Sequence, residues 1–194
     1  MRRSLGQITV ICGSMFAGKS EELIRRARRA LYARKTVQVF KPEIDRRYDE
    51  RMVVTHMGVK HAAETVKSVS DLKSKILPET DVILIEEAQF FDDSLADFVV
   101  ELADRGQDVI LAGAEQDFRR KPFGPMPLLL CAADEVVKLR AICMQCGAPA
   151  SHNYRMIDGK PAHVDDPVIL VGASESYEAR CRRCYRIFTG KRRR

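Results

Sequence analysis

The octapeptide GSMFAGKS at residues 13–20 restricts the possible folds more than any other segment of the sequence. It matches G-x-x-x-x-G-K-[ST], the pattern of a glycine-rich loop that joins a strand to a helix and holds phosphate groups. The apolar segment 7–12 predicts the strand, and segment 19–35 has the apolar period of a helix. The positions expected on the apolar face of this helix are Leu23, Ile24, Ala27, Ala30 and Leu31. A glycine turn beside a surface lysine is the alternative interpretation.

Each part of the predicted loop has a role in phosphate binding. Backbone N–H groups of the loop and of the helix N-terminus point at phosphate oxygens. Lys19 would reach the β- and γ-phosphates, and Ser20 would bind Mg²⁺. The sequence therefore predicts a Mg-nucleotide site formed by Gly13, Ser14, Met15, Phe16, Ala17, Gly18, Lys19 and Ser20.

The rest of the first 140 residues alternates apolar runs with helical segments. Segments 36–40, 81–87 and 108–114 predict strands, and 68–77 and 94–106 predict helices. Continuous apolar runs are typical of parallel strands that are covered on both faces. We therefore expect an α/β fold of the P-loop, RecA-like class: a parallel sheet flanked by helices.

The character of the sequence changes near residue 140, where long helical periodicity ends. We expect a nucleotide-binding core at 1–140 and a small C-terminal lobe at 141–190. The last residues, 191–194, form a basic tail, for which a solvated end is the simplest interpretation.

Two adjacent acids, Glu86 and Glu87, end the apolar run 81–87. In P-loop proteins, an acid at the end of a neighbouring strand usually holds the magnesium shell. Because neighbouring strand residues point to opposite faces, one of the two acids is available for other work. Glu87 could then accept a proton from an attacking hydroxyl or from water. Two solvated acids at a strand end are the alternative.

Four of the six cysteines form two C-x-x-C pairs in the C-terminal lobe, a pattern typical of a closed, tetrahedral zinc site. The expected ligands are Cys143, Cys146, Cys181 and Cys184. Two separate redox motifs are the alternative. Both remaining cysteines, Cys12 and Cys131, lie in apolar surroundings and are expected in the core.

The formal net charge of +6 fits ligands that carry phosphate groups. No apolar run approaches the ~20 residues of a membrane span, and the N-terminal segment has no apolar signal core. These observations predict a soluble, cytoplasmic protein. They also leave open a P-loop NTPase with a zinc ribbon that binds nucleic acid, although a strand-moving helicase normally needs two such cores in a longer chain.

Several segments together resemble the zinc-containing thymidine kinases, in the same order along nearly the whole chain. These segments are GSMFAGKS, IEEAQFF, FRRKPFG, the two C-x-x-C pairs and VILVGASESYEARCRRCY. The resemblance implies transfer of the γ-phosphate of ATP to the 5′-hydroxyl of thymidine, and of deoxyuridine, with Mg²⁺ bound beside ATP and a structural zinc. It further implies a cytoplasmic homotetramer, inhibited by thymidine triphosphate, with no nucleic-acid partner. A kinase for a different nucleoside or small alcohol is an alternative.

The resemblance also assigns roles to individual residues. Lys19 and Glu87 correspond to the catalytic positions, with Glu87 as the base, and Gln89 follows the acids as in the family. Glu86 stands where the family usually has aspartate, which leaves open whether it contacts magnesium directly or through water. Asp45 and Arg47 match residues near the phosphates and the reacting hydroxyl. The predicted nucleoside contacts are Phe118 and, in a loop that closes over thymine, Val168, Ile169, Leu170, Val171, Gly172 and Tyr177.

Overall fold

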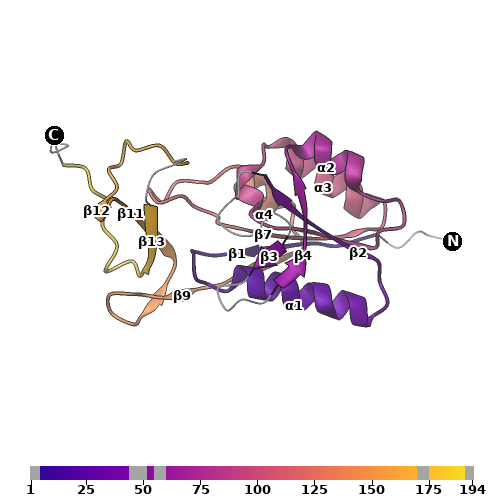
Figure 1. The fold of residues 1–194 in the computed structure, drawn as a ribbon, viewed down its shortest axis with the longest axis horizontal. Helices are drawn as coiled ribbons and strands as arrows, with labels where there is room; N and C mark the ends of the chain where they lie inside the picture. Colours follow the sequence, from indigo (N-terminus) through magenta and orange to yellow (C-terminus); the bar gives the residue numbers. More distant parts are fainter. Residues whose placement is uncertain (1–4, 44–51, 55–59, 170–174, 191–194) are drawn as a thin grey trace.

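The computed structural model describes residues 5–43, 52–54, 60–169 and 175–190. Five predicted site residues lie outside the described residues: Asp45, Arg47, Leu170, Val171 and Gly172. Within these limits the chain forms a large α/β part and a smaller part built of short strands (Figure 1).

The α/β part contains a six-stranded sheet in the order β5-β2-β6-β7-β1-β8, and every neighbouring pair is parallel. Its strands are β1 (Ile8–Cys12), β2 (Val37–Pro42), β5 (Glu64–Val66), β6 (Val82–Ile85), β7 (Asp108–Gly113) and β8 (Glu135–Lys138). The strand that leads into the glycine-rich loop, β1, is separated from the strand that precedes the two acids, β6, by β7. The predicted parallel sheet of the RecA-like class is confirmed.

Helices cover both faces of this sheet. They are α1 (Lys19–Tyr32), α2 (Val69–Lys75), α3 (Ser94–Asp104) and α4 (Met126–Ala132), together with the 3₁₀ turn η1 (Ala88–Phe90). Leu23 and Ile24 of α1 pack with Ile11 of β1, whereas Phe98 of α3 packs in a separate cluster with Val10. Neighbouring residues of β1 therefore point into opposite layers, with α1 below the sheet and the other helices above it (Figure 1).

Local interactions stabilise helix α1, and the local backbone conformation determines where it ends. Glu22 in its first turn accepts hydrogen bonds from Arg25 and Arg26 at 2.6 and 2.9 Å, which supports the helix in the favourable acid-first order. The helix ends at Tyr32, before the predicted residue 35, because Arg34 adopts a left-handed conformation with φ 59°. The last turn is solvent-exposed, so Leu31 is 48% exposed and its predicted place on the buried face is wrong.

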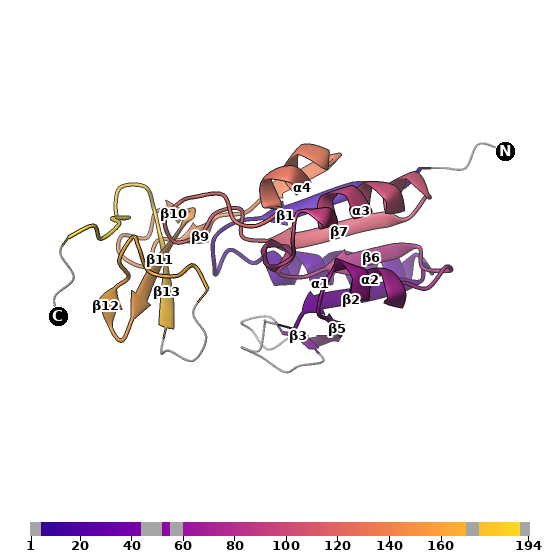
Figure 2. The same ribbon diagram turned by 90° about the horizontal axis from the view of Figure 1, so that it is seen from above.

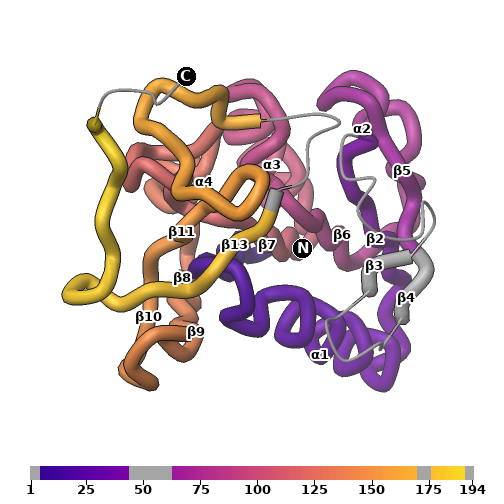
Figure 3. Tube along the Cα trace, turned by 60° about the vertical axis from the view of Figure 1, so that its left-hand side comes forward, coloured from indigo at the N-terminus to yellow at the C-terminus, as the bar shows by residue number. Residues whose placement is uncertain are grey.

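Several elements of the α/β part were not predicted. They are β5, β8, α4, η1 and the antiparallel pair β3 (Met52–Val54) and β4 (Lys60–Ala62), which lies beside α1 (Figure 3). Helix α4 also corrects the prediction for Cys131. The buried side of α4 consists of Met126 and Leu129, so the side chain of Cys131 faces solvent, whereas Cys12 is buried as expected.

The smaller part consists of strands β9 (Ala141–Ile142), β10 (Pro149–Ala150), β11 (His152–Ile157), β12 (Lys160–Pro161) and β13 (Glu175–Arg180). Strands β9 and β10 form one antiparallel pair, and β12-β11-β13 form a three-stranded antiparallel sheet. This part lies beyond the end of the large sheet at which β1 ends, as Figures 1 and 2 both show. It therefore faces the glycine-rich loop. In the part of the chain that the structure describes, no helix has the length and apolar character to cross a bilayer.

Candidate active site

The glycine-rich loop depends on two glycines for its path. A Cβ on Gly13 would lie 2.7 Å from the carbonyl oxygen of Leu139, so only glycine allows this close approach of two backbone segments. Gly18 precedes α1 with φ 85°, a left-handed conformation that favours glycine. The N-cap residue, Gly18, has no side chain that could bind the first N–H groups of α1, which suits these groups to a ligand. The predicted strand–loop–helix arrangement is present.

Ser20 and Glu86 lie together although they are far apart in the sequence. The Ser20 hydroxyl donates a hydrogen bond of 2.6 Å to Oε1 of Glu86, which is 6% exposed. Strand β6 ends at Ile85, so its parallel pairing in the sheet carries Glu86 to the edge where the loop begins. A hydroxyl and a carboxylate in contact at a phosphate loop are suited to hold Mg²⁺.

Glu87 turns away from the strand by an unusual backbone conformation. Its φ is 50°, in the left-handed region that non-glycine residues adopt only when their surroundings enforce it. Strand β6 ends at Ile85, before Glu86 and Glu87, so the predicted alternation of side chains along a strand does not apply to these two acids. The left-handed turn at Glu87 gives its side chain a different direction instead. Nε2 of Gln89 donates a hydrogen bond to the Glu87 carboxylate.

Gln89 is itself held by the end of β7. It is 4% exposed, and its Oε1 accepts a hydrogen bond of 3.0 Å from the backbone N–H of Ala114. A Cβ on Gly113 would lie 2.7 Å from the same oxygen, so a side chain there would displace Gln89. The amide of Gln89 therefore fixes the direction of the Glu87 carboxylate.

Phe118 lies in a buried environment that the smaller part of the chain completes. Its ring is 5.1 Å from the guanidinium carbon of Arg155, and the Tyr185 hydroxyl donates to its backbone carbonyl. Burial raises the pKa of Tyr185 above its usual value, so the hydroxyl keeps the proton that it donates. Phe118 is 4% exposed, so in this structure its ring packs as a core residue does.

Arg155 was not predicted, yet it connects several predicted residues. Its Nη1 donates to the carbonyl oxygens of Pro167 and Val168, at 2.5 and 3.2 Å. Its guanidinium also lies 5.9 Å from the ring centroid of Tyr177. Phe118, Val168 and Tyr177 therefore surround the guanidinium group of Arg155. Ile169, another predicted nucleoside contact, is 43% exposed. A single arginine in a short strand gives no sequence signal that separates it from a surface residue.

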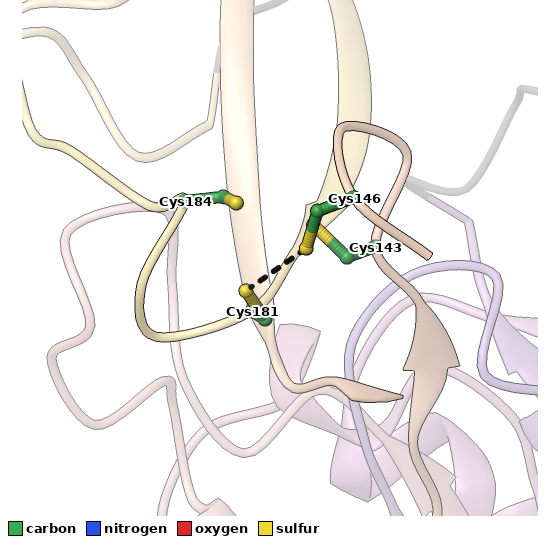
Figure 4. A group of neighbouring side chains, drawn as sticks. All are labelled: Cys143, Cys146, Cys181 and Cys184. Atoms are coloured by element: carbon green, nitrogen blue, oxygen red, sulfur yellow. Dashed lines mark hydrogen bonds between the residues drawn. The ribbon is translucent and has the colours of Figure 1, made fainter. Parts of the chain in front are cut away.

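The four paired cysteines converge from two loops, with their sulfur atoms turned toward one another (Figure 4). All four sulfur atoms lie within 4.8 Å of one another, and Cys146 and Cys181 are 3.6 Å apart. Four thiolates around zinc at ~2.3 Å would be separated by about 3.8 Å. All four cysteines are free thiols, so the cluster can hold a metal ion of this kind.

The geometry of the loop, the acids and the cysteine cluster agrees with a comparison to known families. A family model described as thymidine kinase matches residues 6–185, a range that includes all of these features. The chain belongs to the thymidine kinase family. This membership confirms the resemblance recognised in the sequence. It also favours a kinase over the nucleic-acid-binding NTPase considered above.

Two solved structures are distantly similar to this thymidine kinase family member. One is domain III of the replication initiation protein DnaA from Thermotoga maritima, with 16% identity, 70% of this chain and 56% of that chain covered, and a TM-score of 0.43. The other is described as an ATPase, with 12% identity, 90% and 79% coverage and the same TM-score of 0.43. The chain thus spans little more than half of the first structure. Neither similarity bears on substrate or partners.

Proposed function

We propose that this protein transfers the γ-phosphate of ATP to the 5′-hydroxyl of thymidine and of deoxyuridine, a salvage step that supplies DNA precursors. The observation that carries the proposal is the contact between Ser20 and Glu86. This pair is suited to Mg²⁺ beside the phosphate loop, and Glu87, the proton acceptor in this proposal, directly follows Glu86 in the sequence. Membership of the thymidine kinase family supports the choice of substrate.

On the phosphate side, residues 13–20 hold ATP through their backbone N–H groups, and Lys19 offsets the negative charge that develops on the transferred group. Ser20 and Glu86 hold Mg²⁺, which neutralises phosphate charge when bound. Glu87, directed by Gln89, accepts the proton of the 5′-hydroxyl as its oxygen attacks the γ-phosphorus of ATP. The bond from this phosphorus to the β,γ-bridging oxygen breaks, and ADP leaves.

On the nucleoside side, Phe118 contacts the base and the loop 168–177 closes over it. This loop recognises thymine through backbone groups. Thymine offers an N3–H donor between two carbonyl acceptors, whereas cytosine has an acceptor at N3 and an amino donor beside it. Each wrong pairing leaves a buried group unsatisfied at a cost of about 1–3 kcal/mol.

The four cysteines bind a structural zinc, which supplies no chemistry to the transfer and fixes the ends of segment 147–180. We also propose the division into a core at 1–140, a lobe at 141–190 and a basic tail at 191–194. The active form is a cytoplasmic homotetramer that thymidine triphosphate inhibits, and Asp45 and Arg47 act near the phosphates.

The test is to mix the protein with Mg-ATP and each of the four deoxynucleosides or deoxyuridine, and to measure kcat/KM for the monophosphate. Thymidine and deoxyuridine should exceed deoxycytidine by roughly 10²- to 10⁴-fold, because two mismatches act together. Lys19→Ala, which removes the charge beside the phosphates, is the inactive control. Comparable values for thymidine and deoxycytidine would reject backbone recognition of thymine, and transfer only to another alcohol would reject the proposed substrate.

A further inference from the structure

One peptide unit of the glycine-rich loop is held at both of its polar ends. The N–H of Met15 donates a hydrogen bond of 2.8 Å to Oδ1 of Asn153. At the other end of the same peptide, the carbonyl oxygen of Ser14 accepts a hydrogen bond of 3.1 Å from Nζ of Lys19. Because a peptide unit is planar, a contact that fixes its N–H also fixes the direction of its C=O. Asn153 therefore influences the group that receives the lysine.

Asn153 is built into its position. It lies in β11, is 4% exposed, and its Nδ2 donates a hydrogen bond of 3.1 Å to the carbonyl oxygen of Gln116, just after β7. The two contacts determine the orientation of the amide, since a carbonyl must face the Met15 N–H and an amino group must face the Gln116 oxygen. One side chain thus joins the loop, the end of the large sheet and the smaller part of the chain.

The other hydrogen bonds to Ser14 are longer. The N–H of Ala17 donates to the Ser14 carbonyl at 3.3 Å. The Ser14 hydroxyl reaches the Ala150 carbonyl at 3.4 Å, longer than the bond to Asn153. Phe16, immediately after Met15, has φ 64° and so adopts a backbone conformation that its surroundings must maintain. A firm contact at Met15 is well placed to maintain it.

We propose that Asn153 is a positioning residue for nucleotide binding. It orients the Ser14–Met15 peptide, and through the Ser14 carbonyl it orients Lys19. This inference rests on the proposed role of residues 13–20 in holding ATP, and it does not depend on which nucleoside is phosphorylated.

The test compares wild-type protein with Asn153→Leu, which keeps the side-chain volume and removes both hydrogen bonds, and with Asn153→Ala. Ser151→Ala is the matched control, because Ser151 lies at the same junction but contributes its backbone carbonyl, which accepts from Gln116 at 2.6 Å. The measurements are Mg-ADP affinity by calorimetry, amide-hydrogen exchange at Met15 and thermal unfolding.

In the Asn153 variants we expect faster exchange at Met15 and a Kd for Mg-ADP raised about 3- to 10-fold, the effect of one lost hydrogen bond. Where the kinase reaction is followed, KM for ATP should rise while KM for the nucleoside stays constant, a separation that general loosening of the fold would not produce. Ser151→Ala should match the wild type in every measurement.

Unchanged Mg-ADP affinity in folded Asn153 variants would overturn the inference, whatever the exchange rate at Met15. Weaker Mg-ADP binding with unchanged exchange at Met15 would also overturn it, because the effect would not pass through this peptide. Unfolding of both variants would assign Asn153 to the fold alone. Failure of the wild type to bind Mg-ADP would instead reject the proposed function, whereas Mg-ADP binding without thymidine phosphorylation would leave the inference standing.

Discussion

The hydroxyl of Ser20 donates a hydrogen bond of 2.6 Å to a carboxylate oxygen of Glu86, across a separation of 66 residues in the sequence. The first residue comes from the phosphate loop, and the second follows a strand that is not adjacent to the strand before that loop. The contact is therefore a product of the parallel sheet, which brings both carboxyl ends to one edge.

The first prediction concerns Mg²⁺. Glu86→Gln and Ser20→Ala should both raise the Mg²⁺ concentration needed for half-maximal activity, because each removes one oxygen ligand or its charge. Ser20→Thr keeps the hydroxyl and is the matched control. The measurement is initial rate against Mg²⁺ at fixed ATP. Identical Mg²⁺ dependence in the wild type and Glu86→Gln would contradict the assignment.

The second prediction concerns the proton acceptor. Glu87→Gln should lower kcat by roughly 10²- to 10⁴-fold, the range expected for a positioned base. Mg-ADP affinity should change little, because the side-chain volume and the hydrogen bond from Gln89 are retained. Glu79→Gln, at an exposed position, is the control. If Glu87→Gln altered Mg²⁺ dependence and Glu86→Gln lowered kcat, the two roles would be reversed.

The third prediction concerns the cysteine cluster. Freshly purified, reduced protein should contain about one zinc per chain, because four thiolates complete a closed shell. Chelation should increase amide-hydrogen exchange in β9–β13 more than in β6 and β7, since all four ligands lie beyond residue 140. Metal analysis and exchange before and after chelation provide the check. Absence of zinc, or uniform loosening of the whole chain, would count against a structural metal here.

The fourth prediction concerns Arg155. Arg155→Met should lower the free energy of unfolding by about 2–4 kcal/mol, because two hydrogen bonds from a buried cation are lost. The variant should also raise KM for the nucleoside more than KM for ATP, since Phe118 and Val168 lose a shared partner. Arg180→Met, at an arginine near the cysteine cluster, is the comparison. Equal changes in both KM values would remove the link to the nucleoside.

The fifth prediction concerns pH. Burial lowers the pKa of His152 below its usual value of about 6.5, and the charges of Arg120 and Arg182 act in the same direction. Near pH 6 the unfolded state therefore binds more protons at this site than the folded state does. The contribution of His152 to the free energy of unfolding is therefore fully present above pH 6.5, and it is lost as the pH falls through the pKa that His152 has in the folded protein.

Denaturant unfolding at pH 7.5 and 5.5 checks this prediction. The wild type should lose more stability between these values than His152→Phe, which removes the titrating group and retains a ring beside Tyr185. The same pH dependence in both proteins would show that other groups control acid stability.

Local sequence patterns were sufficient for part of the fold. The continuous apolar runs of β6 and β7 identified buried parallel strands, because such strands have no polar face. Strand β8 was missed for the opposite reason. It is the edge strand of the sheet, and its residues alternate between half-buried and exposed over only four positions, too few to reveal a period.

The same distinction applies to the site. The loop at 13–20 and the paired cysteines have characteristic spacing, so their residues were found without any knowledge of the fold. Asn153 and Arg155 have no such spacing, because their importance comes from partners 12 to 138 residues away. The roles of Asn153 and Arg155 depend on backbone groups that are distant in the sequence, so these roles can be recognised only in the folded structure.

The position of the cysteines also determines the order of events during synthesis. All six strands of the large sheet lie before Cys143, so a ribosome adds all of their residues before it adds the first cysteine of the cluster. Translation from Cys143 to Cys184 then takes roughly 2–8 s at about 5–20 residues per second. During this interval the nascent chain contains all residues of the large sheet and an incomplete set of thiols. Binding of the proposed zinc by all four cysteines therefore follows the synthesis of every strand of the large sheet.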